Sequence, residues 1–262
     1  MDMKQSITYK QLKRIIAEAI GNDSLSSIWN TLSKNDGDDE TNDITITTAA
    51  TDSSCFKIKN GVLLKYIGDG GHVVIPDTVK AIRGYAFAKC VGLESIKIPD
   101  SVKNIGANAF YHCSGLKSVT IPDSVTKIGE EAFNQCNNLI SVSLPNSIRI
   151  IADKTFAGCS NLTSITIPDS VTGIEFMAFY DCNNLASVVI PDSVTTIGAH
   201  AFADCWKLAS IVIPDSVTHI GFNAFLRCRQ LINAKIPVHF LEGDMAEIKN
   251  AFSQTPLLKM LF

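Results

Sequence analysis

Apolar and polar positions along this chain alternate in a way that predicts short strands. In residues 162–168, which read LTSITIP, two isoleucines alternate with Ser164 and Thr166. Alternation of this kind, with β-branched residues, is typical of a strand that turns one face inward. Pro168 lacks an amide hydrogen, so we expect it to end the strand and begin a turn.

The residues that follow predict a turn and then a short helical segment. Asp169 and Ser170 have side chains that readily bond to turn backbone. Val171 and Ile174 are the next inward positions. The apolar residues within residues 175–182 are spaced as in one or two helical turns. One unit is therefore a strand, a turn, an inward pair and helical turns.

This unit returns every 23 residues, a step that three residue types keep. Its markers are Pro76, Pro99, Pro122, Pro145, Pro168, Pro191, Pro214 and Pro237, Phe87, Phe110, Phe133, Phe156, Phe179, Phe202 and Phe225, and Cys90, Cys113, Cys136, Cys159, Cys182, Cys205 and Cys228. A fixed period of roughly 20 to 50 residues is the signature of a solenoid. One coil cannot bury its apolar face alone, so we expect successive strands to stack in parallel, about 4.8 Å apart.

The repeated phrase also resembles a known family. Leu-x-x-Ile-x-Ile-Pro followed by Ile-Gly-x-x-Ala-Phe-x-x-Cys-x-x-Leu resembles the BspA-like class of leucine-rich repeats, the treponemal 23-residue type, over residues 55–237. The resemblance implies an α/β leucine-rich-repeat solenoid, with a parallel concave sheet and short helical turns on the other side. It also implies a non-enzymatic, often cell-surface protein that binds host or partner macromolecules.

The pattern divides the chain into five segments. Residues 1–35 are predicted to form a helical extension, and residues 36–54 an acidic, polar linker with a strand. Residues 55–75 resemble a capping hairpin followed by the first strand. Residues 76–237 carry the 23-residue leucine-rich repeats, and residues 238–262 form an irregular C-terminal cap.

The segments before the repeats have their own patterns. In residues 1–35, two apolar runs at helical spacing predict a helical hairpin. The hairpin either packs on the array or serves as a separate module that docks a partner. Residues 35–42 read NDGDDETN, an acidic linker, and residues 44–48 alternate as a strand does. Asn60-Gly61 between two apolar runs predicts a β-hairpin.

The last repeat departs from the period. Phe252 follows Phe225 by 27 residues, and Thr255 stands where a cysteine would fall. An insertion of this kind, with a helix predicted over residues 243–252, indicates a terminal cap that covers the last apolar face.

Composition and charge narrow the function classes. Hydrophobic residues make up 46% of the chain, which is ample for a continuous core, and the net charge of -3 argues against a nucleic-acid partner. No run of 18 apolar residues occurs, so no membrane span is predicted. The first residues lack the apolar core of a signal peptide, which favours a cytoplasmic protein. If a signal peptide has been removed, a cell-surface or secreted protein is expected instead.

No cofactor, metal site or catalytic set is predicted. Zinc sites need ligands a few residues apart, whereas the repeat cysteines are 23 apart, so we expect a ladder of buried, reduced thiols. The aspartates after the prolines predict turn chemistry, although a column of like charges could also be relieved by a cation. No histidine is placed to activate a serine, so the chain is not expected to be an enzyme.

Two surfaces are candidate contact sites. The first lies on the helical side of the last coils, where large residues flank alanines at the same phase, either interdigitated or around an apolar groove; it comprises Phe176, Tyr180, Trp206, Phe222, Leu226 and Arg229. The second is the concave Ser/Thr surface, with Ser118, Thr120, Ser141, Ser143, Ser164, Thr166 and Ser187. Aromatic residues and arginine are enriched where partners bind, which favours the first surface.

The sequence therefore predicts a non-enzymatic scaffold that binds a protein or glycan partner, with self-association as a further use of the helical side. The alternatives are a secreted or cell-surface adhesin of the BspA-like type, and a structural or ice-binding Ser/Thr lattice.

Overall fold

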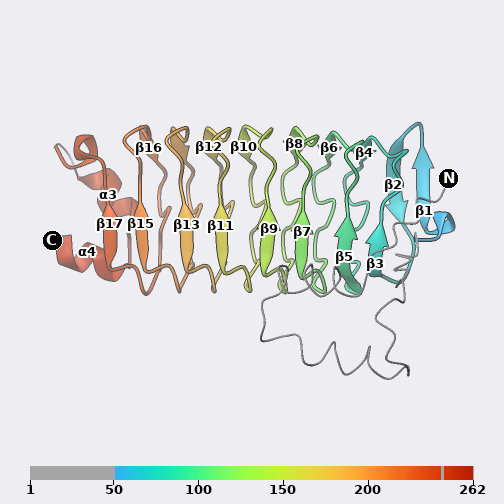
Figure 1. The fold of residues 1–262 in the computed structure, drawn as a ribbon. Coiled ribbons are helices and arrows are strands. Elements are labelled where there is room, and N and C mark those ends of the chain that lie inside the picture. The colour runs from blue at the N-terminus through green and yellow to red at the C-terminus, as the bar shows by residue number, and fades with distance from the viewer. Residues whose placement is uncertain (1–50, 243–244, 262) are drawn as a thin grey trace, which may run out of the picture. The chain divides into compact units, whose positions relative to one another are not determined.

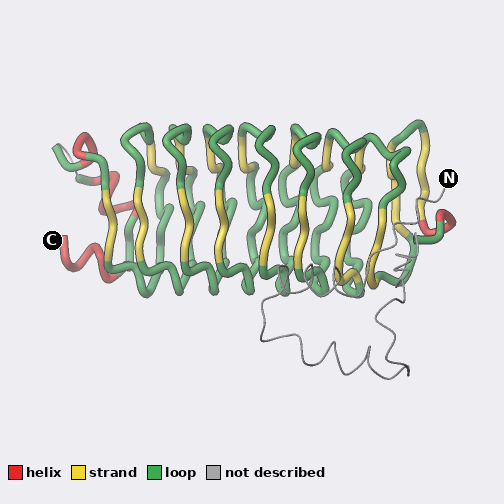
Figure 2. Tube along the Cα trace, in the orientation of Figure 1, coloured by secondary structure: helices red, strands yellow, loops and turns green. Residues whose placement is uncertain are grey.

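The computed structural model describes residues 51–242 and 245–261. The helical extension predicted at residues 1–35 and the strand predicted at residues 44–48 lie outside the described residues. From Thr51 onward the chain is a parallel β-solenoid of about eight turns with little helix (Figure 1). Figure 2 shows helix only at the two ends of this array, with strands and turns between them.

Each coil places one strand on a first face, called here the front sheet, whose hydrogen-bonded ladder is interrupted after the fourth and the sixth strand. Its strands are β3 (Gly71–Val74), β5 (Leu93–Lys97), β7 (Ser118–Thr120), β9 (Ser141–Ser143), β11 (Ser164–Thr166), β13 (Ser187–Val189), β15 (Ser210–Val212) and β17 (Asn233–Lys235). Paired strands are parallel and offset by 23 residues, as in Ile165 with Val188. Ile165 is buried between exposed Ser164 and Thr166, so the predicted alternation is confirmed.

A second set of shorter strands, called here the back sheet, lies on the other face in two hydrogen-bonded groups. It contains β4 (Ala81–Ile82), β6 (Asn104–Ile105), β8 (Lys127–Ile128), β10 (Ile150–Ile151), β12 (Gly173–Ile174), β14 (Thr196–Ile197) and β16 (His219–Ile220). At its start, β1 (Phe56–Lys59) and β2 (Val62–Tyr66) pair antiparallel, and β2 pairs with β4. Asn60 and Gly61 join them with φ of 51° and 74°. Positive φ at both positions is what a type I′ hairpin requires, and Asn-Gly tolerates it.

The short helical turns predicted after the back strand are wrong. Two residues in each coil have left-handed backbone and interrupt any helix, for example Met177 (φ 54°) and Asp181 (φ 60°). The Phe179 N–H donates to the Ala201 carbonyl of the next coil at 2.8 Å, and the same bond recurs along the array. In an α-helix these N–H groups would bond within their own coil. The segment is therefore a stack of turns joined by hydrogen bonds between coils.

Stacked aromatic rings form the centre of the core. From Tyr66 to Phe252 every neighbouring pair has ring centroids 4.8 to 5.6 Å apart and interplanar angles of 4 to 25°. The phenylalanine rings are fully buried. A period of 23 residues brings one ring per coil to the same place, so their apolar area is removed from water as a continuous column.

The C-terminal cap follows the last coil. It consists of η3 (Val238–Phe240), α3 (Ala246–Ala251) and α4 (Pro256–Leu261). The helix predicted over residues 243–252 is found as α3, within narrower bounds. Phe252 stacks on Phe225 at 4.8 Å, so the four inserted residues leave the ring column in register. Within the described residues, no helix combines the length and apolar character needed to cross a bilayer.

Candidate functional site

The repeat thiols are structural. Six cysteines, from Cys113 to Cys228, are buried and free, and each Sγ–H donates to the phenylalanine carbonyl of the preceding coil at 3.1 to 3.3 Å. Burial raises the pKa of Cys136 and of Cys228 to about 12, so these thiols are not nucleophiles at neutral pH. Cys55 and Cys90 are only partly buried. In the described part of the chain, no three His, Cys, Asp or Glu side chains are grouped as metal ligands.

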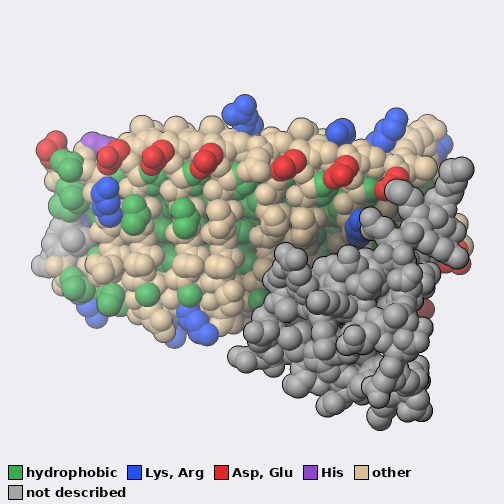
Figure 3. All heavy atoms as spheres, in the orientation of Figure 1, with side chains coloured by type: hydrophobic (Ala, Val, Ile, Leu, Met, Phe, Trp, Pro, Cys, Tyr) green, Lys and Arg blue, Asp and Glu red, His purple; other side chains and the backbone are tan. Residues whose placement is uncertain are grey.

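The Asp-Ser turns join neighbouring coils. The serine hydroxyl donates to a valine carbonyl of the preceding coil, as in Ser193 to Val171 at 2.7 Å. Ser101, Ser124, Ser147 and Ser216 make the equivalent bond, whereas the buried Ser170 Oγ has no partner among the described residues. The preceding aspartates are exposed, and Figure 3 shows acidic side chains in a row along one edge of the front sheet. The sequence predicts bonds to the backbone of the same turn, whereas these serine bonds join two coils.

The second candidate surface is the outward side of the front sheet. The structure brings Ser118, Thr120, Ser141, Ser143, Ser164, Thr166 and Ser187 together there, and all of them are exposed. The Ser/Thr pattern changes in the next two coils. There Val189 and Val212 occupy the position equivalent to Thr166, and their side chains are 62% and 57% exposed. The surface is thus a hydroxyl lattice over the middle coils and an apolar patch over the later ones. Among the described residues, no Phe, Tyr or Trp side chain lies on this surface.

The first candidate surface, called here the aromatic face, comprises Phe176, Tyr180, Trp206, Phe222, Leu226 and Arg229. Phe176 and Phe222 are 37% and 59% exposed. The His200 ring lies between them, 6.1 Å from the Phe176 centroid and 6.0 Å from that of Phe222, with edge-on geometry in both contacts. The three rings thus form one continuous row. Sequence reasoning missed His200 because it compared only residues of equal phase, and His200 follows Ala199 by one position.

The second part of the aromatic face is a stacked pair. The Arg229 guanidinium carbon lies 4.5 Å from the Trp206 ring centroid, within the range of a cation–π contact. The Trp206 Nε1–H donates to Asp204 Oδ1 at 3.2 Å, and Arg227 bonds the other carboxylate oxygen at 3.5 Å. Asp204 is buried. A buried carboxylate therefore orients the indole, and the only sequence signal for this role is Asp181, which stands at the same phase one coil earlier and accepts a bond from Asn183.

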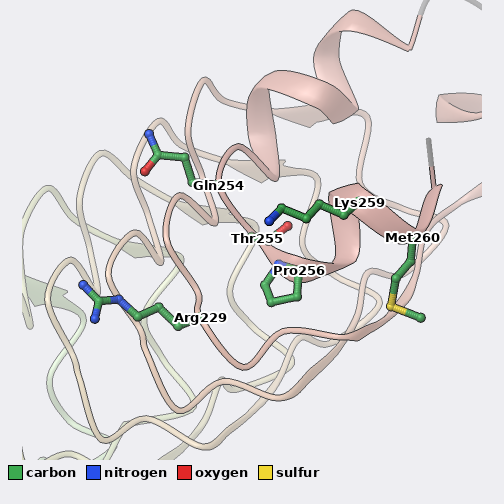
Figure 4. Close-up of a pocket in the computed structure, with 6 residues that line it drawn as sticks. All are labelled: Arg229, Gln254, Thr255, Pro256, Lys259 and Met260. Atoms are coloured by element: carbon green, nitrogen blue, oxygen red, sulfur yellow. The ribbon is translucent and has the colours of Figure 1, made fainter.

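Tyr180, Ala203 and Leu226 share one phase in the coils that carry the row of three rings and the Trp206–Arg229 pair. Tyr180 and Leu226 are partly buried, and Ala203, at the same phase between them, is fully buried. Beyond Arg229 the surface continues into an open pocket of about 470 Å³ in the C-terminal cap (Figure 4). Its lining consists of Arg229, Gln254, Thr255, Pro256, Lys259 and Met260.

The solved structures that this chain is similar to are bacterial leucine-rich-repeat proteins. A leucine rich cell surface protein from Faecalibacterium prausnitzii A2-165 is 35% identical, with a TM-score of 0.61 over 72% of this chain and 54% of that one. Leucine-rich repeat proteins from Eubacterium ventriosum ATCC 27560 and Bacteroides ovatus ATCC 8483 are 31% and 33% identical, with TM-scores of 0.63 and 0.56. Those alignments cover 71% and 67% of this chain, and 50% and 52% of theirs. The chain thus spans about half the length of these proteins.

Among curated proteins, none matches the chain significantly. The family described as BspA type Leucine rich repeat region (6 copies) matches residues 65–186 and 149–262. These two overlapping ranges cover more than half of the chain and include the ring column, the thiol column and the cap. The chain belongs to the BspA-type leucine-rich-repeat family.

Proposed function

We propose that this chain is a non-enzymatic recognition scaffold that binds a protein or glycan partner through the aromatic face. The observation that carries the proposal is the pairing of Trp206 with Arg229. The indole is 38% exposed, yet Asp204 and Arg229 hold it in one orientation. An exposed side chain that is already ordered loses less entropy on binding, and Trp and Arg are among the residues that contribute most to interface energies.

The contrast with the front sheet supports this choice of surface. Hydroxyl groups of the front sheet are small and exposed, and they bury little apolar area on contact. The aromatic face instead offers the Phe222 ring and the Trp206 indole, which suit either an apolar protein side chain or the face of a sugar ring. The front-sheet surface that includes Ser164 and Thr166 is retained as the matched alternative.

A second candidate is a cell-surface adhesin. The similar protein from Faecalibacterium prausnitzii is described as a cell surface protein, and this chain spans about half of its length. An adhesin would use the same surface on the outside of the cell.

The experiment compares two double variants. Wild-type protein, Tyr180→Glu/Trp206→Glu and Ser164→Ala/Thr166→Ala are labelled and applied to a glycan array and to surface extracts of the source cell. We expect the first variant to lose at least ten-fold in binding, while the second binds as wild type does. Equal melting curves establish that each variant is folded. If the front-sheet variant alone loses binding, the aromatic face is not the contact surface.

A further inference from the structure

The two sheets end differently at the C-terminal end of the array. In the back sheet, the last strand is β16, and its Ile220 N–H donates to Oε1 of Glu247 at 2.9 Å. The same oxygen lies 3.1 Å from Nδ1 of His219. The carboxylate of Glu247, on α3, thereby takes the place of a carbonyl that the next coil would supply. The back sheet is closed.

The front sheet has no such closure. Its last strand, β17, pairs with β15 alone. The Ile213 N–H of the preceding coil donates to the Lys235 carbonyl at 3.0 Å. Backbone N–H and C=O groups alternate in direction along a strand. Those of Ile211 and Ile213 point to the next coil, so the backbone groups of the equivalent Ala234 and Ile236 point away from the array. Within residues 51–242 and 245–261 no strand pairs with that side of β17.

Cationic side chains lie beside the start of β17. The Leu257 N–H donates to the Leu231 carbonyl at 2.9 Å, which holds α4 next to the residues that precede the strand. Figure 4 shows Arg229 and Lys259 in the pocket at this place. In the described part of the chain, neither cation forms an ion pair with a carboxylate. The open strand edge thus begins at two cations without carboxylate partners.

We infer that β17 accepts an added parallel strand, and that the strand is residues 44–48 of a second copy of this chain. Those residues read ITITT, and Thr45-Ile46-Thr47 repeats the outward, inward, outward pattern of Ser164-Ile165-Thr166. Paired with β17, Ile46 occupies the inward position next to Ala234. An exposed sheet edge that binds an extended segment through backbone hydrogen bonds is a recurrent mode of protein recognition.

Charge selects the direction of the added strand. The segment that precedes it, DGDDETND at residues 36–43, is acidic. In a parallel strand this segment reaches the start of β17, beside Arg229 and Lys259. In an antiparallel strand it would lie at the opposite end, away from both cations. Opposite charges at close range favour the parallel arrangement and weaken with salt.

The strand comes from a second copy because its own chain is too short. Thr51 lies at the first strand of the front sheet, where its hydroxyl accepts the Val74 N–H at 2.7 Å. Seven strand spacings of about 4.8 Å separate β3 from β17, roughly 34 Å. Residue 48 is three residues from Thr51 and can extend at most about 11 Å from it. A head-to-tail contact of this kind adds one copy after another, and it builds open-ended assemblies unless its rotation closes a ring.

The test uses the full chain in sedimentation velocity over a concentration series at low and high salt. Wild-type protein is expected to form a series of oligomers that dissociates as salt is raised. Ala234→Pro removes an outward N–H and is expected to abolish association, and Lys259→Glu to weaken it at least ten-fold. Lys127→Glu, an exposed lysine on β8, is the matched control and is expected to associate as wild type does. Melting curves check that each variant folds.

A charge exchange makes the test independent of folding defects. Asp39→Lys/Glu40→Lys protein is expected not to associate with itself, nor Lys259→Glu protein with itself. A mixture of the two is expected to associate, because the unchanged acidic segment of the Lys259→Glu protein meets the unchanged edge, with Arg229 and Lys259, of the Asp39→Lys/Glu40→Lys protein. The inference is overturned if wild-type protein stays monomeric up to its solubility limit, or if the mixture stays monomeric. Binding of a glycan or protein at Trp206 is unaffected by either result.

Discussion

The two ends of the array continue the same core but close it with different chemistry. At the N-terminal end, Tyr66 of the β1–β2 hairpin stacks on Phe87 at 5.0 Å, and the Thr51 hydroxyl bonds the first front strand. At the C-terminal end, Phe252 stacks on Phe225, and Glu247 bonds the last back strand. A ring can cover either end of the column, because each phenylalanine ring stacks equally well on both of its faces. Backbone ladders need an oxygen or N–H at a defined point, and each end supplies it from a different residue.

The thiol column also differs at its two ends from the middle of the array. Cys90 is only partly buried at one end, and at the other Thr255 replaces the cysteine. Its Oγ1 donates to the Phe252 carbonyl at 2.7 Å and accepts the Leu258 N–H at 3.2 Å. The Thr255 hydroxyl forms hydrogen bonds within its own coil, whereas each thiol donates a hydrogen bond to the preceding coil. Coupling between coils through this column is therefore confined to the middle.

Alkaline pH should produce the largest loss of stability. Burial raises the pKa of the six inner thiols above the ordinary value of 9.0, with Cys136 and Cys228 at about 12. The stabilisation is complete below the unfolded-chain value and is lost as pH rises toward the folded values. Each thiol contributes up to about 1.4 kcal/mol per pH unit in that window. Urea unfolding at pH 8 and pH 10 should show a fall of several kcal/mol.

Single cysteine substitutions show how much a middle thiol and an end thiol each contribute to this pH dependence of stability. Cys159→Ala should reduce the pH dependence by one thiol's share, and Cys90→Ala by less because Cys90 is half-buried. Iodoacetamide should label Cys55 and Cys90 in native protein and all eight cysteines after denaturation without reductant. Incomplete labelling of the denatured chain would mean that disulfides are present.

Removal of a middle ring should have the next largest effect. Phe156 has a stacked ring on each side, at 5.6 and 5.5 Å, and is fully buried. Phe156→Ala should lower the free energy of unfolding by roughly 3–5 kcal/mol, because a cavity remains between two rings. Phe252→Ala should cost less, since within the described residues Phe252 stacks on Phe225 alone, and the short cap beside it can relax. Denaturant melts give both values, and a cost below about 1 kcal/mol for Phe156 would contradict the core assignment.

Loss of the C-terminal backbone cap should have an intermediate effect. Glu247→Ala leaves the Ile220 N–H without an acceptor, which should cost about 1–3 kcal/mol. Glu247→Gln keeps an oxygen and should recover most of this stability, because the contact with the exposed His219 contributes little. Amide hydrogen exchange at Ile220 should be faster in the alanine variant only. Equal exchange in both variants would mean that charge, not hydrogen bonding, protects this edge.

The smallest expected change in stability comes from two serines at equivalent positions of neighbouring coils. Ser193→Ala removes the hydrogen bond to Val171 and should cost about 0.5–1.5 kcal/mol. Ser170→Ala removes a buried hydroxyl that has no partner among the described residues, so stability should stay the same or increase. Urea midpoints measured side by side give the comparison. If both variants lose the same stability, the coil-to-coil bond does not account for the serine column.

Much of the fold could be predicted from local pattern. A period of 23 residues requires residues of equal phase to stack, so Phe156 and Phe179 are core neighbours whatever the details of the coil. Alternation in β11 assigns Ile165 inward and Ser164 outward for the same reason. The aromatic face could be proposed from residue types, but its geometry could not. His200 and Asp204 take part through side-chain directions that depend on their left-handed backbone.

The sequence by itself determined which residues stack and which face the core, because those properties depend only on the repeat length and on the apolar pattern. Tertiary structure alone decided where the hydrogen bonds go. The segment with Phe179 has helical spacing, yet alternate N–H groups, those of Met177, Phe179 and Asp181, bond to the next coil. The serine and cysteine side chains also bond across coils. A donor chooses between its own coil and a neighbour by the distance to each carbonyl, and stacking sets that distance only once the coils are assembled.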